Sequence, residues 1–280
     1  MHQAKATVEV EEHRYPFTGA ENARVKLGMV RATDSAVRWL DLPAEDGYIA
    51  RVDWHPDGRL LVQWLARNWQ RLELRAYDHS GAASTLLIEE LQPWINLHHD
   101  LRAVEATGEF TWSSERSGFR HLYLYAPDGT LVRQLTSGNW PAEATVALDE
   151  NGRQVYFVGW QERPLDRQLF RVSLNGGDDE PLTRGSGMTG AVIAPDFSSY
   201  VSTSDYLIEP PNINVVSLRD QKVTRVIHSP SEVAVDYPPP ELHSFRTSDG
   251  VELFAAIYRP SQDFPPPRAG EGDFSGAGGK

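Results

Sequence analysis

The sequence predicts an all-β protein that forms part of a β-propeller, and three observations support this prediction. Hairpin patterns, in which two alternating strands flank a tight turn, recur along most of the 280 residues. Their spacing is nearly constant. Eight Trp and ten Tyr suit broad sheets with aromatic layers between them. A period of roughly 40–50 residues with about four strands per period is typical of propeller blades.

One hairpin of each period is expected to be the outer half of a blade. Residues 121–138, HLYLYAPDGTLVRQLTSG, alternate, turn at Pro127-Asp128-Gly129 and alternate again. Residues 168–185 repeat this pattern, and both copies end in Leu-Thr-x-Gly. Equivalent hairpins are predicted at 26–42, 71–89, 121–137, 168–184 and 212–228. The second apolar position of their first strands recurs at steps of 45, 50, 47 and 44 residues (Leu27, Leu72, Leu122, Leu169 and Ile213).

The inner half of each blade is expected to be a second hairpin. Candidates occupy residues 52–65, 99–115, 146–160 and 191–205, with turns such as Asp57-Gly58 and Asn151-Gly152. Gly and Asn tolerate the positive φ that tight hairpin turns require. Each period therefore contains two consecutive hairpins, which make one four-stranded blade. The alternative, a β-sandwich, seldom keeps a near-constant period over five copies.

This pattern gives about four complete blades between residues 44 and 230 and the closing half of another before Pro43. A closed propeller usually has about four to eight blades, so an array that begins in mid-blade is expected to be part of a larger ring. Such an open array would expose strand edges.

The period stops after Tyr237, where a run of prolines begins. Residues 241–260 read as a new hairpin that turns at Ser248-Asp249-Gly250. We predict a partial propeller over residues 1–237 and a linker with the opening hairpin of a second domain over 238–264. Residues 265–280 are rich in Pro and Gly and are predicted to be disordered.

Composition excludes several classes of protein. The formal net charge of −12, with no visible basic face, argues against nucleic-acid binding. No stretch approaches 18 consecutive apolar residues, so no membrane span is expected. The absence of cysteine excludes disulfides and thiolate metal sites. We expect a soluble protein, cytoplasmic or periplasmic, without a metal or cofactor; the first residues do not resemble a signal peptide.

Five segments, in the correct order, resemble the dipeptidyl peptidase IV family of the prolyl oligopeptidase class. They are residues 11–30, 93–100, 109–125, 155–174 and 243–260, and the resemblance covers about residues 8–264. The segment EFTWSSERSGFRHLYLY (109–125) is most similar to the branch of dipeptidyl peptidases 8 and 9. The resemblance implies an eight-bladed propeller on an α/β-hydrolase domain, a homodimeric parent enzyme and peptide substrates cleaved after an N-terminal Xaa-Pro or Xaa-Ala dipeptide.

The catalytic serine, aspartate and histidine of this family belong to the hydrolase domain, and no residue here matches them. No Gly-x-Ser-x-Gly elbow occurs in the 280 residues. From Pro267 on, the sequence departs from the family pattern, as a truncated, frameshifted or chimaeric end would. The chain is thus expected to be an inactive propeller portion without catalytic residues. One alternative is a stand-alone propeller that binds proteins through its loops, and another is a fragment without function. Residues 241–264 favour the peptidase.

The candidate site residues are Asn96, His98 and Asp100, in the segment PWINLHHD. They could be metal ligands or a catalytic relay, but a relay needs a nucleophile nearby. Adjacent histidines on an extended chain point to opposite sides, which disfavours a shared metal. The resemblance places this loop at the border of the substrate cavity, so the three are candidates for a substrate-side role. The alternative is a polar connection between blades.

Other polar and aromatic residues are expected to be structural. The family grips the substrate ammonium with a pair of glutamates, but that pair lies farther upstream than Glu11-Glu12, which we read as a solvated connector. A second prediction is an ion pair between Asp166 and Arg167 at a blade edge. The remaining structural predictions concern Glu115, Arg116, Arg120 and His121, and a blade-core position for Trp54, Trp64, Trp112 and Trp160.

Overall fold

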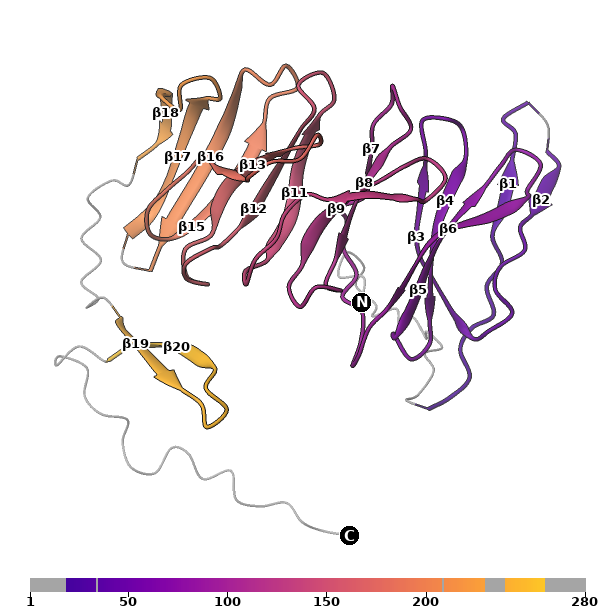
Figure 1. Cartoon of the computed structure of the whole chain (residues 1–280), viewed down its shortest axis with the longest axis horizontal. Coiled ribbons are helices and arrows are strands. Elements are labelled where there is room, and N and C mark those ends of the chain that lie inside the picture. The colour runs from indigo at the N-terminus through magenta and orange to yellow at the C-terminus, as the bar shows by residue number, and fades with distance from the viewer. Residues whose placement is uncertain (1–18, 34, 208, 230–239, 260–280) are drawn as a thin grey trace, which may run out of the picture. The chain divides into compact units, whose positions relative to one another are not determined.

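The computed structural model describes residues 19–33, 35–207, 209–229 and 240–259. In these residues the chain forms four four-stranded sheets and two two-stranded sheets, all antiparallel, and no helix (Figure 1). Strands follow one another across each sheet in sequence order. The predicted all-β class, the four complete blades and the preceding half blade are confirmed. The described part of the chain thus has no helix long and apolar enough to cross a membrane.

The chain divides into two compact units, and the first covers residues 1–138. It begins with a two-stranded sheet, the closing half of a blade. Blade I and blade II follow, each with four strands. The bounds are β1 (Gly28–Val30) and β2 (Val37–Trp39); β3 (Gly47–Trp54), β4 (Leu60–Ala66), β5 (Arg71–Tyr77) and β6 (Ala83–Glu90); then β7 (Arg102–Ala103), β8 (Phe110–Ser114), β9 (His121–Tyr125) and β10 (Leu131–Gln134).

The second unit covers residues 139–280 and holds blade III, blade IV and a last hairpin. The bounds are β11 (Ala142–Asp149), β12 (Gln154–Gly159), β13 (Gln168–Ser173) and β14 (Glu180–Pro181); β15 (Met188–Ile193), β16 (Ser199–Tyr206), β17 (Glu209–Ser217) and β18 (Val223–His228); then β19 (Glu241–Arg246) and β20 (Glu252–Ile257). The predicted boundary at 237/238, the disordered tail 265–280 and the connector at Glu11-Glu12 lie outside the described residues.

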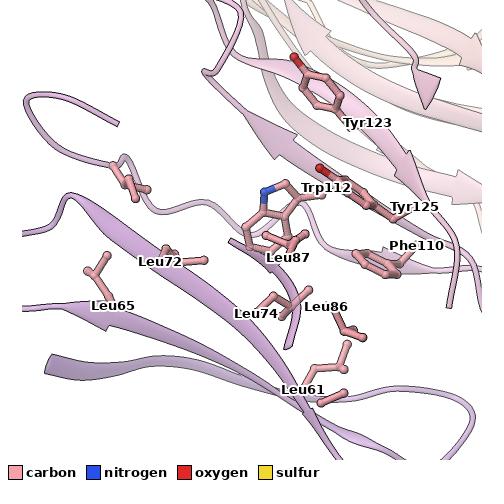
Figure 2. Packing of buried hydrophobic residues seen from close by; sticks show 12 residues of the cluster. Leu61, Leu65, Leu72, Leu74, Leu86, Leu87, Phe110, Trp112, Tyr123 and Tyr125 are labelled. Carbon is pink, nitrogen blue, oxygen red and sulfur yellow. The ribbon is translucent and has the colours of Figure 1, made fainter. Parts of the chain in front are cut away.

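The central strand β4 is apolar along most of its length because both of its faces are covered. Leu61 and Leu65 belong to a cluster that also contains Trp112 from blade II (Figure 2). Leu60 and Val62, on the opposite face, pack with residues of the β1–β2 hairpin. Because side chains alternate along a strand, these two sets point to opposite faces of the sheet. Strand β4 therefore contributes to two hydrophobic clusters, one on each face.

The Leu-Thr-x-Gly ending of the β9–β10 hairpin forms a latch. The hydroxyl of Thr136 accepts a hydrogen bond from the backbone N–H of Leu122 at 3.0 Å. It donates in turn to Nδ1 of His121, and Nε2–H of that ring donates to the carbonyl of Gly138, both at 3.0 Å. Gly138 has a φ of 124°, which favours glycine. The end of the repeat is thereby tied to the first residue of its own hairpin.

The β13–β14 hairpin of blade III closes by the same latch, with glutamine in place of histidine. Thr183 accepts from the backbone N–H of Leu169 at 2.9 Å and donates to Oε1 of Gln168 at 2.8 Å. Nε2 of Gln168 donates to the carbonyl of Gly185 at 2.8 Å. The repeated motif therefore has a local physical role: it satisfies the backbone at the end of an outer hairpin.

Two predictions about structural residues are wrong. Trp54 was expected in a blade core, but its side chain is 63% exposed at the last position of β3. Trp64 and Trp112 are buried as predicted, and Trp160, directly after β12, is half-buried. Asp166 pairs with Arg163 at 2.7 Å and accepts the N–H of Gly187, instead of pairing with Arg167. Sequence adjacency suggested the second pair, but neighbouring side chains on an extended segment diverge.

Candidate functional site

The connection between β6 and β7, residues 91–101, holds all three predicted site residues. His98 and Asp100 are buried, whereas Asn96 and His99 are exposed. The two histidines thus face opposite sides, as neighbours on an extended chain do. Nδ2 of Asn96 donates to a carboxylate oxygen of Glu115 at 2.9 Å. Asn96 is consequently the only one of the three candidates that presents an exposed side chain.

His98 is fixed in the contact between blades I and II of the first unit. Its ring meets the indole of Trp112 edge to face, with centroids 4.5 Å apart. Nδ1 accepts the backbone N–H of Asp100 at 3.2 Å. The Asp100 carboxylate accepts from the Ser113 hydroxyl at 2.7 Å, and its backbone carbonyl accepts from the Thr111 hydroxyl at 3.2 Å. The backbone and the side chain of Asp100 thereby tie the loop to two hydroxyl side chains of β8.

Burial lowers the pKa of His98 to about 4, because removal from water disfavours the charged imidazolium. The carboxylate of Asp100 opposes this shift, while the guanidinium groups of Arg120 and Arg51 reinforce it. At neutral pH the ring is therefore uncharged. Its Nδ1 is already engaged as an acceptor, so His98 fits a positioning role better than that of a general base.

A second buried carboxylate, Glu89, lies at the end of β6. One of its oxygens accepts from Nε1 of Trp112 at 3.1 Å, and the other from the hydroxyl of Ser114 at 2.7 Å. Arg116 forms an ion pair with Glu89 and places its guanidinium over the ring of Tyr123, 4.7 Å from the centroid. Although burial disfavours the charge of Arg116, the Glu89 carboxylate holds its pKa above the ordinary value.

Sequence reasoning missed Glu89, although a signal for it exists. In the alternation of β6, Leu87 is buried, Ile88 is exposed and Glu89 is buried, so period 2 puts the glutamate on the inward face. An inward acidic residue demands a partner, because an unpaired buried charge is costly. That partner, Arg116, was predicted to be structural but not assigned to a carboxylate.

The space among these groups is small. A cavity of about 10 Å³ is bordered by Glu89, Asn96, His98 and Arg120 among others, which is room for about one water molecule at most. Within the described residues no three His, Asp or Glu side chains are grouped to hold a metal ion. The arrangement can therefore hold two blades in register and present Asn96 and Glu115 at its surface.

Comparisons with known proteins agree with this architecture. The model of the family "Dipeptidyl peptidase IV (DPP IV) N-terminal region" matches residues 1–211. The probable dipeptidyl-aminopeptidase B of Emericella nidulans is 29% identical over 278 residues, which include 90% of this chain and 31% of that protein. Human dipeptidyl peptidase 8 is 26% identical over 333 residues, with 91% of this chain and 37% of that protein covered.

Solved structures extend the similarity to the fold. The crystal structure of Porphyromonas gingivalis dipeptidyl peptidase 4 matches with a TM-score of 0.81 and 25% identity, over 93% of this chain and 38% of that one. A putative dipeptidyl aminopeptidase IV from Bacteroides ovatus matches with a TM-score of 0.78 and 19% identity, over 90% of this chain and 40% of that one. The chain thus spans roughly a third of the curated relatives cited here. With three quarters of its residues matched by the family model, the chain belongs to the dipeptidyl peptidase IV N-terminal region family.

Proposed function

We propose that this chain is the propeller portion of a serine-type dipeptidyl peptidase that releases Xaa-Pro and Xaa-Ala dipeptides from peptide N-termini. The observation that carries the proposal is the family match over residues 1–211, together with relatives that are named as dipeptidyl peptidases. In this role the propeller positions the peptide, and a hydrolase domain performs acyl transfer through a serine, a histidine and an oxyanion hole.

The 280 residues contain no Gly-x-Ser-x-Gly elbow, so we expect no turnover from this chain alone. We propose that the β19–β20 hairpin is the opening of the hydrolase domain. The parent enzyme would act as a homodimer, as the resemblance implies. Among the loop candidates, a direct substrate contact would fall to Asn96, because His98 and Asp100 are buried and can act only by positioning the loop.

A chimaera tests this function directly. The matched region of Porphyromonas gingivalis dipeptidyl peptidase 4 is replaced by the corresponding residues of this chain, which the structural similarity defines. We expect the chimaera to hydrolyse a Gly-Pro chromogenic amide, while the 280-residue chain alone gives no product. The unaltered enzyme is the positive control.

Two outcomes would contradict the proposal. Turnover by the isolated chain that a serine-directed phosphonate abolishes would mean that a nucleophile has been overlooked. A chimaera that is folded and dimeric by sizing but inactive would indicate that this propeller does not serve a peptidase. A monodisperse, folded isolated chain would then favour a stand-alone binding module.

A further inference from the structure

Two exposed tryptophans lie on neighbouring segments at one end of blade I. Trp69, in the turn between β4 and β5, is 42% exposed, and Trp94, in the connection after β6, is 56% exposed. The backbone N–H of Ile95 donates to the carbonyl of Trp69 at 2.6 Å, so the two segments run side by side. We call these two residues and the flanking amides of Asn68, Gln70, Gln92 and Asn96 the Trp69–Trp94 surface.

The backbone of Trp69 is strained. Its φ of 62° is in the left-handed region, which is unfavourable for a bulky residue. A turn alone would be better served by Gly or Asn at this position. Strained residues of this kind cluster at binding sites and other functional positions. The exposed indole is thus kept here at a conformational cost.

The amide side chains of this surface use their oxygens within the surface itself. Nε2 of Gln70 donates to Oε1 of Gln92 at 2.8 Å and to the carbonyl of Pro93 at 3.2 Å. Nδ2 of Asn68 donates to Oε1 of Gln70 at 3.2 Å, and the backbone N–H of Gln70 donates to Oδ1 of Asn68 at 3.0 Å. Nε1 of Trp94 donates to Oδ1 of Asn96 at 3.2 Å. All four side-chain oxygens therefore already accept a hydrogen bond.

The amide nitrogens, in contrast, keep spare N–H groups. Nδ2 of Asn68 and of Asn96 each use one of two N–H groups, and Nε2 of Gln92 has no acceptor in the described part of the chain. An open depression of about 330 Å³ borders this row of amides, and its charged members, Arg71 and Glu90, are paired with each other at 2.6 Å. The surface consequently offers indole rings and hydrogen-bond donors without a net charge.

A proline-rich peptide is the chemical complement of such a surface. Its prolines have no backbone N–H and offer only carbonyl acceptors, and their rings pack on aromatic side chains. The polyproline II helix exposes all its carbonyls and loses little entropy on binding. We propose that the Trp69–Trp94 surface binds extended proline-rich peptides in the polyproline II conformation. Asn96 belongs both to this surface and to the substrate-side loop proposed above. The proposal is tested by peptide binding to the isolated chain, so its failure and the failure of the catalytic proposal are distinguishable.

The test is a titration of the 280-residue chain with an acetylated, amidated decaproline peptide, followed through the indole N–H signals of the ¹⁵N-labelled protein. We expect saturable shifts at Trp69 and Trp94, and no binding of a Gly-Ser decapeptide. Trp94→Ala and Trp69→Gly should each weaken binding by at least about tenfold, as truncation of an interface tryptophan commonly does. Trp69→Gly removes the ring and also relieves the backbone strain, so it does not endanger the fold.

The matched control is Trp39→Ala, which removes an indole of β2 that is 62% exposed and lies outside the surface. The Trp39→Ala variant should bind the decaproline peptide as tightly as the wild-type chain does. Thermal melts establish that all variants are folded. Absence of saturable shifts in the wild-type chain would overturn the proposal. Unchanged affinity in both surface variants, or equal binding of the Gly-Ser peptide, would also overturn it.

Discussion

Blades II and III close their outer hairpins with the same latch, but blades I and II and blades III and IV are joined by different chemistry. The first pair shares a large apolar cluster and, beside it, the buried Glu89 with its ion pair to Arg116. The second pair is joined by apolar and aromatic side chains, including Tyr156 stacked on Phe197 at 5.9 Å. Each comparison concerns contacts within one compact unit.

Closing a hairpin within a blade and joining two blades are therefore separate structural requirements. A hairpin must satisfy its own backbone, and a short motif can do this in every copy. A contact between blades needs two complementary surfaces, so one contact can enclose a buried ion pair beside its apolar cluster while another relies on apolar and aromatic packing. Substitutions in the contact between blades and in the latches should therefore have separable effects on stability.

The largest effect is expected for Glu89→Ala. It removes the carboxylate partner of the Arg116 guanidinium and leaves the Trp112 indole N–H and the Ser114 hydroxyl without their acceptor. We expect a loss of about 3–4 kcal/mol in the free energy of unfolding, measured by urea denaturation. The control is Glu90→Ala, which breaks an exposed pair and should cost less than about 1 kcal/mol. Similar losses for the two variants would refute the special role of the buried pair.

As the pH falls, the first unit should lose stability at a higher pH than the second unit does. The pKa of His98 is about 4 in the folded chain against 6.5 ordinarily, so the unfolded chain takes up the proton first. Stability should fall as the pH drops from about 6.5 to about 4, by up to about 3 kcal/mol. The described histidines of the second unit, His228 and His243, are exposed.

Amide exchange in β6 and β8, measured across this pH range, checks the acid effect. His98→Gln should flatten the dependence in these strands and leave exchange in β12 and β16 unchanged. An equal acid response in the variant and the wild type would show that His98 is not the responsible group.

Removing the threonine hydroxyl should destabilise the protein more in the latch whose threonine is more deeply buried. Thr136 is 2% exposed, whereas Thr183 is half-buried. Thr136→Val should cost about 2 kcal/mol and Thr183→Val about 1 kcal/mol, because each leaves a backbone N–H without its acceptor. Thermal or urea unfolding of the two variants measures the ranking, and the reverse order would contradict this account of the latch.

The smallest effect on stability is expected when the histidine of one latch is replaced by the glutamine of the other, or the reverse. His121→Gln and Gln168→His preserve one acceptor and one donor at similar positions, so each should change stability by less than about 1 kcal/mol. His121→Ala is the reference for a broken latch and should cost about 2 kcal/mol. If His121→Gln were as damaging as His121→Ala, the two latches would not be equivalent.

Much of the fold could be predicted from the sequence, because hairpins are local. Period-2 alternation and the near-constant spacing identified both hairpins of every blade, and Asp-Gly or Asn-Gly turns marked some of them, such as Asp57-Gly58 and Asn151-Gly152. The candidate site was predicted less completely. The position of the 91–101 loop was recognised, but the burial of His98 and Asp100 was not, since it depends on Trp112 and Ser113 of another strand.

The all-β class, the four blades with the preceding half blade and the recurrence of the latch motif could be derived from the order of the residues alone. These features follow from interactions between residues close in the chain, which repeat wherever the motif repeats. The three-dimensional packing was needed to establish that Glu89 meets Arg116, that His98 is uncharged beside Trp112, and that Trp54 and Trp69 remain exposed. Those outcomes depend on which surfaces of neighbouring blades meet, and contacts between distant segments leave no periodic signal in a single sequence.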